Sequence, residues 1–117
     1  MSRYLEKYKI ARNIDVDETA DIEVAHKCQL FGLQAGNTGV GQHALYLKFY
    51  DKATAATVGT DTPVMTMFIA SGHEIVQEFK GGIDFANGIS LACTSVATDA
   101  DDTAISANDM VVNLIYK

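Results

Sequence analysis

The segment Ala44–Val64, with the sequence ALYLKFYDKATAATVGTDTPV, joins a tightly alternating run to a long loop of small residues. A two-residue period is typical of a β-strand with one buried face, because successive side chains point to opposite sides of a sheet. The loop contains Gly59 and is closed by Pro63, residue types that punctuate structure. The buried set is expected to be Leu45, Leu47 and Phe49, and the outward set Tyr46, Lys48 and Tyr50.

The same alternation recurs along the chain in short runs separated by turn signals, without a convincing helical period. We expect one residue, Gly88, to mark a bulge or a close backbone approach. Turns are expected at Asp17–Asp21, Ser71–Glu74 and Lys80–Gly82, a tight turn or bulge near Ala25–Cys28, a flexible connection at Gly36–Gly41 and a polar loop at Thr98–Asn108. The runs are Ile10–Val16, Ile22–Val24, Leu30–Leu33, Val64–Ala70 (buried on both faces), Ile75–Phe79, Ile83–Val96 and Met110–Tyr116.

About seven or eight short strands in 117 residues predict an all-β chain. We expect a single-domain β-sandwich, jelly-roll-like, over residues 10–117, preceded by a short N-terminal arm over residues 1–9. A hydrophobic content of 48% and a charged content of 21% support a folded core rather than disorder.

The formal net charge of −6 argues against non-specific binding of nucleic acid, which depends on clustered Lys and Arg. It favours protein partners. The charge is uneven, because residues 1–12 hold four basic residues against the single acid Glu6. This basic segment either docks on an acidic partner or is an exposed terminus. Its candidate partner contacts are Arg3, Tyr4, Lys7 and Tyr8.

No apolar run resembles a secretory signal or a membrane span, so we expect synthesis in the cytoplasm of the producing cell and no membrane partner. In such a chain Cys28 and Cys93 are expected to be small buried hydrophobes rather than a disulfide. Tyr46 and Tyr50, on the outward parity, are either interface anchors or cross-strand cover for the sheet.

Candidate catalytic and metal-binding residues do not form a recognisable pattern. Asp99, Asp101 and Asp102 lack the spacing of a calcium loop, and we interpret them as a solvated turn. The histidines are far apart in sequence, without the paired ligands that start a zinc site. Glu74 and Asp84 are conceivable as paired carboxylates of a glycosidase. We expect no enzyme activity, no metal and no cofactor.

Three stretches resemble small virion proteins of tailed bacteriophages. They are YLKFYDKATAATVGTDTPVMTM (46–67), GGIDFANGISLACTSVATDADDT (81–103) and ANDMVVNLIYK (107–117). The resemblance covers roughly residues 10 to 117, and its most specific parts are Tyr46–Pro63, the Gly88–Ser90 step and the final apolar strand. The proteins that it resembles are capsid cement or head decoration proteins.

This resemblance implies a structural β-sandwich on the capsid surface of the virion, which binds the major capsid protein, stabilises the head and self-associates as a homotrimer. The alternative is a tail- or baseplate-associated virion module of the same fold. A more distant alternative is a small carbohydrate-binding or hydrolytic domain, for which the chain offers no tryptophan and few other aromatic residues.

Overall fold

The alternating runs form eight β-strands in the computed structural model, which describes residues 7–117; these residues contain no helix. The all-β prediction is confirmed. Arg3 and Tyr4 of the predicted arm lie outside the described residues. The strands are β1 (Lys9–Asn13), β2 (Asp21–Val24), β3 (Cys28–Asn37), β4 (Leu45–Tyr50), β5 (Met65–Ile69), β6 (Glu74–Phe85), β7 (Ile89–Thr94) and β8 (Met110–Tyr116).

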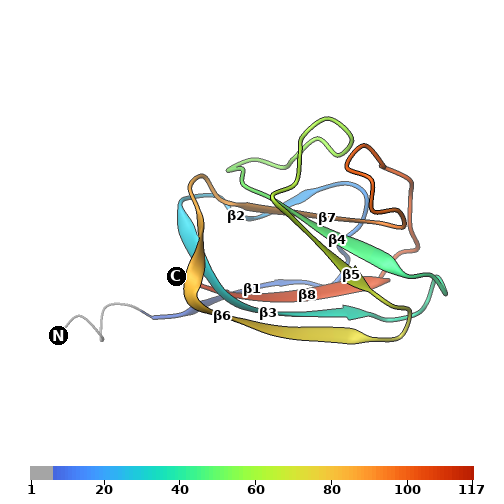
Figure 1. The fold of residues 1–117 in the computed structure, drawn as a ribbon, viewed down its shortest axis with the longest axis horizontal. Coiled ribbons are helices and arrows are strands. Elements are labelled where there is room, and N and C mark those ends of the chain that lie inside the picture. The colour runs from blue at the N-terminus through green and yellow to red at the C-terminus, as the bar shows by residue number, and fades with distance from the viewer. Residues whose placement is uncertain (1–6) are drawn as a thin grey trace.

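The strands pair in two antiparallel four-stranded sheets that pack face to face (Figure 1). Sheet A has the order β1-β8-β3-β6, and sheet B has the order β2-β7-β4-β5. The first strand thus pairs with the eighth, the second with the seventh, the third with the sixth and the fourth with the fifth. This is a long double ribbon rolled on itself, the arrangement of a jelly roll. The predicted jelly-roll-like sandwich is confirmed.

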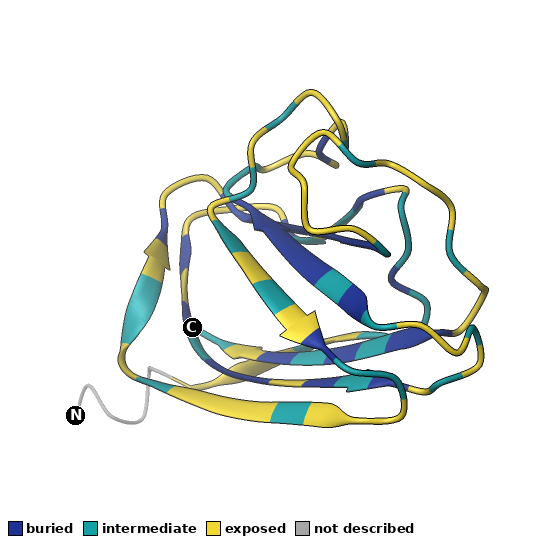
Figure 2. Cartoon of the chain, turned by 45° about the vertical axis from the view of Figure 1, so that its right-hand side comes forward, coloured by how far each residue is buried: buried dark blue, intermediate teal, exposed yellow. Residues whose placement is uncertain are grey.

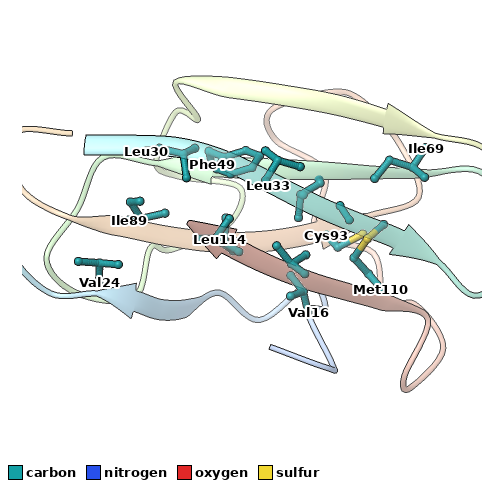
Figure 3. Close-up of a cluster of buried hydrophobic side chains, with 14 of the residues drawn as sticks. Val16, Val24, Leu30, Leu33, Phe49, Ile69, Ile89, Cys93, Met110 and Leu114 are labelled. Carbon is teal, nitrogen blue, oxygen red and sulfur yellow. The ribbon is translucent and has the colours of Figure 1, made fainter. Parts of the chain in front are cut away.

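The core lies between the two sheets and takes one parity from most strands (Figure 3). Leu45, Leu47 and Phe49 of β4 are buried as predicted. Both cysteines are free and buried within this apolar layer, which also confirms their expected role. The face of sheet B that meets the core is therefore the one indicated by the alternation.

The sequence Lys80–Gly82, predicted as a turn between two strands, is instead a bulge inside the long strand β6. The pairing with β3 passes from Leu30 opposite Ile83 to Gly32 opposite Glu78, so β6 accommodates four residues where β3 has only Phe31. Positive φ angles of 84° at Gly81 and 81° at Gly82 permit the bend. β6 therefore bends at the bulge and remains paired with β3 on both sides of it.

The run Ile83–Val96 is broken in the structure by a turn at residues 86–88 between β6 and β7. The carboxylate of Asp51, at the end of β4, accepts hydrogen bonds from the backbone N–H groups of Ala86 at 3.1 Å and Asn87 at 2.8 Å. Gly88 follows, and a Cβ atom there would stand 2.3 Å from the carbonyl oxygen of Val24. The close approach predicted for Gly88 is confirmed.

The segment Val64–Ala70, predicted to be buried on both faces, is buried on one only. Met65, Met67 and Ile69 point inward, while Thr66 and Phe68 are exposed. β5 is the edge strand of sheet B, and no other part of residues 7–117 buries its outer side. The first strand is also shorter than predicted, because β1 ends at Asn13.

Candidate functional site

The outer side of sheet A carries a set of apolar side chains that no other part of the described chain covers. Directly paired residues of antiparallel strands project from the same face. The register therefore places Ile10, Ile115, Gly32 and Glu78 in one row across the sheet. The next row holds Arg12, Asn113, Gln34 and Val76. We call the apolar residues of this side the open face: Tyr8, Ile10, Phe31, Val76 and Ile115.

The residues of the open face are more exposed than is usual for large apolar side chains. The exposed fraction is 72% for Ile10, 71% for Val76 and 41% for Ile115. Figure 2 shows the long exposed stretch of β6 along the margin of this sheet. Contiguous apolar patches on a soluble domain commonly mark contacts with another protein or a ligand. The open face is therefore the main candidate site.

A hollow of about 1050 Å³ lies on this face, between β1 and β6. Gly32 contributes to its floor, because it lies in the middle of the sheet and has no side chain to fill the row between Ile115 and Glu78. One end is closed by Tyr8 and Phe31, whose ring centroids are 5.3 Å apart in an edge-to-face arrangement. The ammonium of Lys117 lies 4.5 Å from the centroid of the Tyr8 ring.

Polar residues line the hollow on central and edge strands alike: Gln34 on β3 and Asn113 on β8 lie in the middle of the sheet, and Glu78 lies on the edge strand β6. Gln34 donates a hydrogen bond to Glu74 at 2.9 Å, which links β3 to β6. Gln77 and Lys80 also line the hollow on the β6 side. Protein–protein interfaces commonly combine exposed apolar side chains with polar groups of this kind. The arrangement suits a protein surface better than reaction chemistry.

The outer side of sheet B differs, because two loops of the chain itself cover much of it (Figure 1). One loop, residues 51–64, packs Ala56 against Tyr50, and its Ala56 N–H donates to the Ser90 hydroxyl at 3.0 Å. The loop is closed by the ion pair of Lys52 and Asp61 at 2.9 Å. The second loop, residues 95–109, is held by Lys48.

Tyr50 was interpreted as either an interface anchor or cover for the sheet, and the interpretation as a partner contact is wrong. Its side chain is 1% exposed, because Ala56 of the covering loop and Ala92 of β7 pack around it. Burial, with the nearby carboxylates of Asp99 and Asp61, raises the pKa of its hydroxyl. Lys48 was placed on the same outward parity and is likewise fully buried, so desolvation lowers the pKa of its ammonium.

Tyr46 remains partly accessible near the uncovered end of sheet B. Its ring centroid is 5.4 Å from that of Phe68, which lies directly opposite on β5. This is the cross-strand pair that was one of the two interpretations of the tyrosine. Phe68 is 55% exposed. The pair is a smaller apolar feature, on the opposite side of the sandwich from the open face.

Two of the four candidate contact residues of the N-terminal arm are among the described residues. Arg3 and Tyr4 lie outside the described residues, whereas Lys7 and Tyr8 are described and exposed. Tyr8 belongs to the open face. Sequence reasoning missed Ile10, Val76 and Ile115, although the apolar residues on both parities of Met110–Tyr116 were a signal that the outer side of this strand is apolar.

The candidate catalytic and metal-binding residues are not brought together. Glu74 pairs with Gly36 and Asp84 pairs with Gln29, so the two carboxylates lie near opposite ends of β6. Within residues 7–117, no group of three or more His, Cys, Asp or Glu side chains is arranged to hold a metal ion. Asp99 lies in a turn and is exposed, as is Asp102, whereas Asp101 is half-buried.

A smaller hollow of about 350 Å³ is lined by His43, Ser106 and Asp109, residue types found in hydrolase triads. One carboxylate oxygen of the buried Asp109 has no hydrogen-bond partner among the described residues. The His43 ring makes no hydrogen bond to Ser106 or Asp109 in this part of the chain. Since a nucleophile and its base must be within hydrogen-bond reach, the arrangement does not constitute a triad.

The described residues 7–117 contain no helix long and apolar enough to cross a membrane. In comparisons with known proteins, no family model, no curated protein and no solved structure gave a significant match to this chain.

Proposed function

We propose that this chain is a structural virion protein, a capsid decoration (cement) protein that binds the major capsid protein on the outside of a bacteriophage head and stabilises the shell. The observation that carries the proposal is the open face, a rigid apolar surface built on four paired strands. The chain has a net charge of −6, which favours a protein rather than a nucleic acid as the partner of this exposed apolar surface. The likeness of residues 46–67, 81–103 and 107–117 to phage cement proteins supplies the identity of that partner.

In this proposal the centre of the open face is the anchor. Ile115 and Phe31 stand beside the hollow over Gly32, so an apolar side chain of the capsid protein can enter between them. Binding energy at such interfaces is concentrated in a few central apolar contacts, with polar residues around them excluding water. Several copies bridging neighbouring capsid subunits after the shell has expanded would add avidity and so hold the subunits together.

The first test is the position of the protein in its purified particle, determined by electron microscopy. Density at the three-fold and quasi-three-fold positions of the head is expected. Density confined to the tail or baseplate would overturn the proposal and support the tail-module alternative. Turnover of a glycan or peptide by the purified protein would likewise support a hydrolase instead.

The second test measures binding of the purified protein to heads that lack it. We expect Ile115→Thr to weaken binding about tenfold, because it removes a central apolar contact while keeping a β-branched residue in the strand. Ile22→Thr is the matched control, since Ile22 on β2 of sheet B has an exposed fraction of 39%, close to the 41% of Ile115. Equal binding by both variants would exclude the open face as the capsid contact.

A further inference from the structure

The two most exposed large apolar side chains of residues 7–117 lie on the two free edges of one sheet. Ile10 is on β1, which pairs only with β8, and Val76 is on β6, which pairs only with β3. Three strand spacings of about 4.8 Å separate β1 from β6, so these side chains cannot cover each other within one copy. Each edge therefore leaves an apolar side chain and an unpaired backbone ready for another strand.

The two edges carry opposite charge. Residues 7–13, KYKIARN, contain Lys7, Lys9 and Arg12 and no acid. The straight part of β6, residues 74–79, contains Glu74 and Glu78 and no base. Arg12 makes no ion pair among the described residues, where the only ion pair is that of Lys52 with Asp61. Glu74 and Glu78 make no ion pair among these residues either, and the hydrogen bond that Glu74 accepts comes from the neutral amide of Gln34, so the charges on both edges are not neutralised within one copy.

We propose that copies of this chain associate head to tail, with β1 of one copy adding to the free edge of β6 of the next in an antiparallel register. The register sets Ile10 opposite Val76 and Arg12 opposite Glu74. The faces of the strands allow this register, because all four side chains lie on the outer side of sheet A, and among the registers that they allow it is the one that pairs Arg12 with an acid and Ile10 with an apolar residue. The antiparallel direction continues the alternation already present in the sheet.

The inner side of the sheet is consistent with the same register. It sets Ala11 opposite Ile75, and both of these already pack against the core of their own copy. The side chain of Asn13 donates to Asp21 at 2.9 Å and to Glu23 at 2.7 Å, which fixes the end of β1 against β2. The edge of β1 is therefore held in a defined place before a neighbour arrives.

Pairings of like edges are disfavoured by charge. Two β1 edges would bring their basic residues together, and two β6 edges would bring together Glu74 and Glu78 of both copies. Pairing of unlike edges is heterologous, because two different surfaces meet at each junction. It produces a closed ring when successive rotations from copy to copy add up to a full turn, and an open chain when they do not. Sheet A would continue from copy to copy, leaving Phe31 and Ile115 in its centre accessible.

The test uses two single charge reversals, Arg12→Glu and Glu74→Arg, with mass measured by light scattering over a range of concentrations. The wild-type protein is expected to associate, and each variant alone is expected to associate about tenfold more weakly, because two like charges then face each other. An equimolar mixture of the two variants is expected to recover association, since each mixed junction pairs either two native edges or two reversed edges. Circular dichroism verifies that each variant is folded.

A matched reversal tests the register. Glu78→Arg changes the same edge by the same charge, but Glu78 faces Tyr8 in the proposed pairing. Mixing it with Arg12→Glu should give less recovery than mixing Glu74→Arg does. Equal recovery from the two mixtures would overturn the register, and failure of Arg12→Glu with Glu74→Arg to recover would overturn the edge pairing.

The edge pairing rests on the self-association included in the proposed function. Edge pairing and capsid binding are nevertheless tested by different experiments. A wild-type protein that stays monomeric at millimolar concentration overturns the edge pairing, and it leaves capsid binding through Ile115 to be judged by the head-binding assay. A protein that associates through β1 and β6 but shows no position on the head would instead overturn the proposed function alone.

Discussion

The ammonium group of Lys48 lies 2.8 Å from the carbonyl oxygen of Thr98, to which it donates a hydrogen bond. A second donation, at 3.3 Å, reaches the carbonyl oxygen of Asp101. Because Lys48 is fully buried on the outer side of β4, these two oxygens replace the water that its charge would otherwise contact. The contact holds the loop of residues 95–109 against sheet B.

We expect Lys48→Met to lower the free energy of unfolding at neutral pH by about 1–3 kcal/mol, because it leaves two carbonyl oxygens without their donor. Methionine is long and flexible enough to fill most of the vacated space. Urea unfolding measures the change. Lys27→Met, at an exposed position, is the control and should stay within about 0.5 kcal/mol of the wild type. Equal stabilities of the two variants would show that the Lys48 contacts contribute nothing.

The same lysine predicts how stability depends on pH. Desolvation lowers the pKa of Lys48 in the folded protein below the 10.5 of an unperturbed lysine. Between these two values the unfolded chain binds more protons, so rising pH stabilises the folded wild-type protein through this group. The cost of burying the charge is fully present below the folded pKa and is progressively relieved as pH rises from the folded pKa to 10.5.

The wild-type protein should therefore gain stability relative to Lys48→Met as pH rises from neutral toward 10.5. The raised pKa of Tyr50 acts in the opposite direction, but that residue is present in both proteins and largely cancels in the comparison. Urea unfolding of both proteins at a series of pH values measures the difference. A difference that does not change with pH would mean that Lys48 titrates normally in the folded state.

Lys48 and Tyr50 also mark the limit of what the sequence predicts here. Alternation is local, so it correctly assigned the inner face of β4 and the positions of most strands. The alternation does not predict whether the outer face of a strand is exposed to solvent or covered by another segment of the chain. The loop of residues 51–64 covers the outer face of β4. Its small residues, including Ala56, let the loop pack closely on Tyr50.

The open face was missed for a related reason. Ile10 and Val76 are exposed because β1 and β6 are the edges of sheet A, and edge positions follow from pairing between distant strands rather than from any single run. Phe31 and Ile115 line the same hollow over Gly32 only because β3 and β8 are neighbours. A sequence pattern with a period of two residues contains none of this non-local information.

Gly88 provides a sharp test of the packing between the β6–β7 turn and its neighbours. An added Cβ would lie 2.3 Å from the Val24 carbonyl oxygen and 2.7 Å from the Lys52 carbonyl oxygen, and backbone atoms cannot move aside easily. We expect Gly88→Ala to destabilise the fold by about 3 kcal/mol, the upper part of the range for overpacking.

Gly72→Ala is the matched control for this substitution. Gly72 has a φ of 74°, but a Cβ there would meet no atom within 4 Å, so only the backbone preference is lost. That cost should be about 1–2 kcal/mol. Thermal or urea unfolding ranks the two variants. A Gly72→Ala protein less stable than Gly88→Ala would contradict the close approach at the turn.

The two cysteines predict a chemical property of the folded protein. Cys93 is fully buried in β7, and burial is the main cause that raises the pKa of its thiol to about 12. Cys28 is also buried, and its pKa is raised for the same reason. Because the thiolate is the reactive form, iodoacetamide at mildly alkaline pH should leave both cysteines unmodified in the native protein and alkylate both in denaturant. Intact-protein mass spectrometry counts the additions, and rapid native alkylation of Cys93 would show that its side chain is not enclosed between the two sheets.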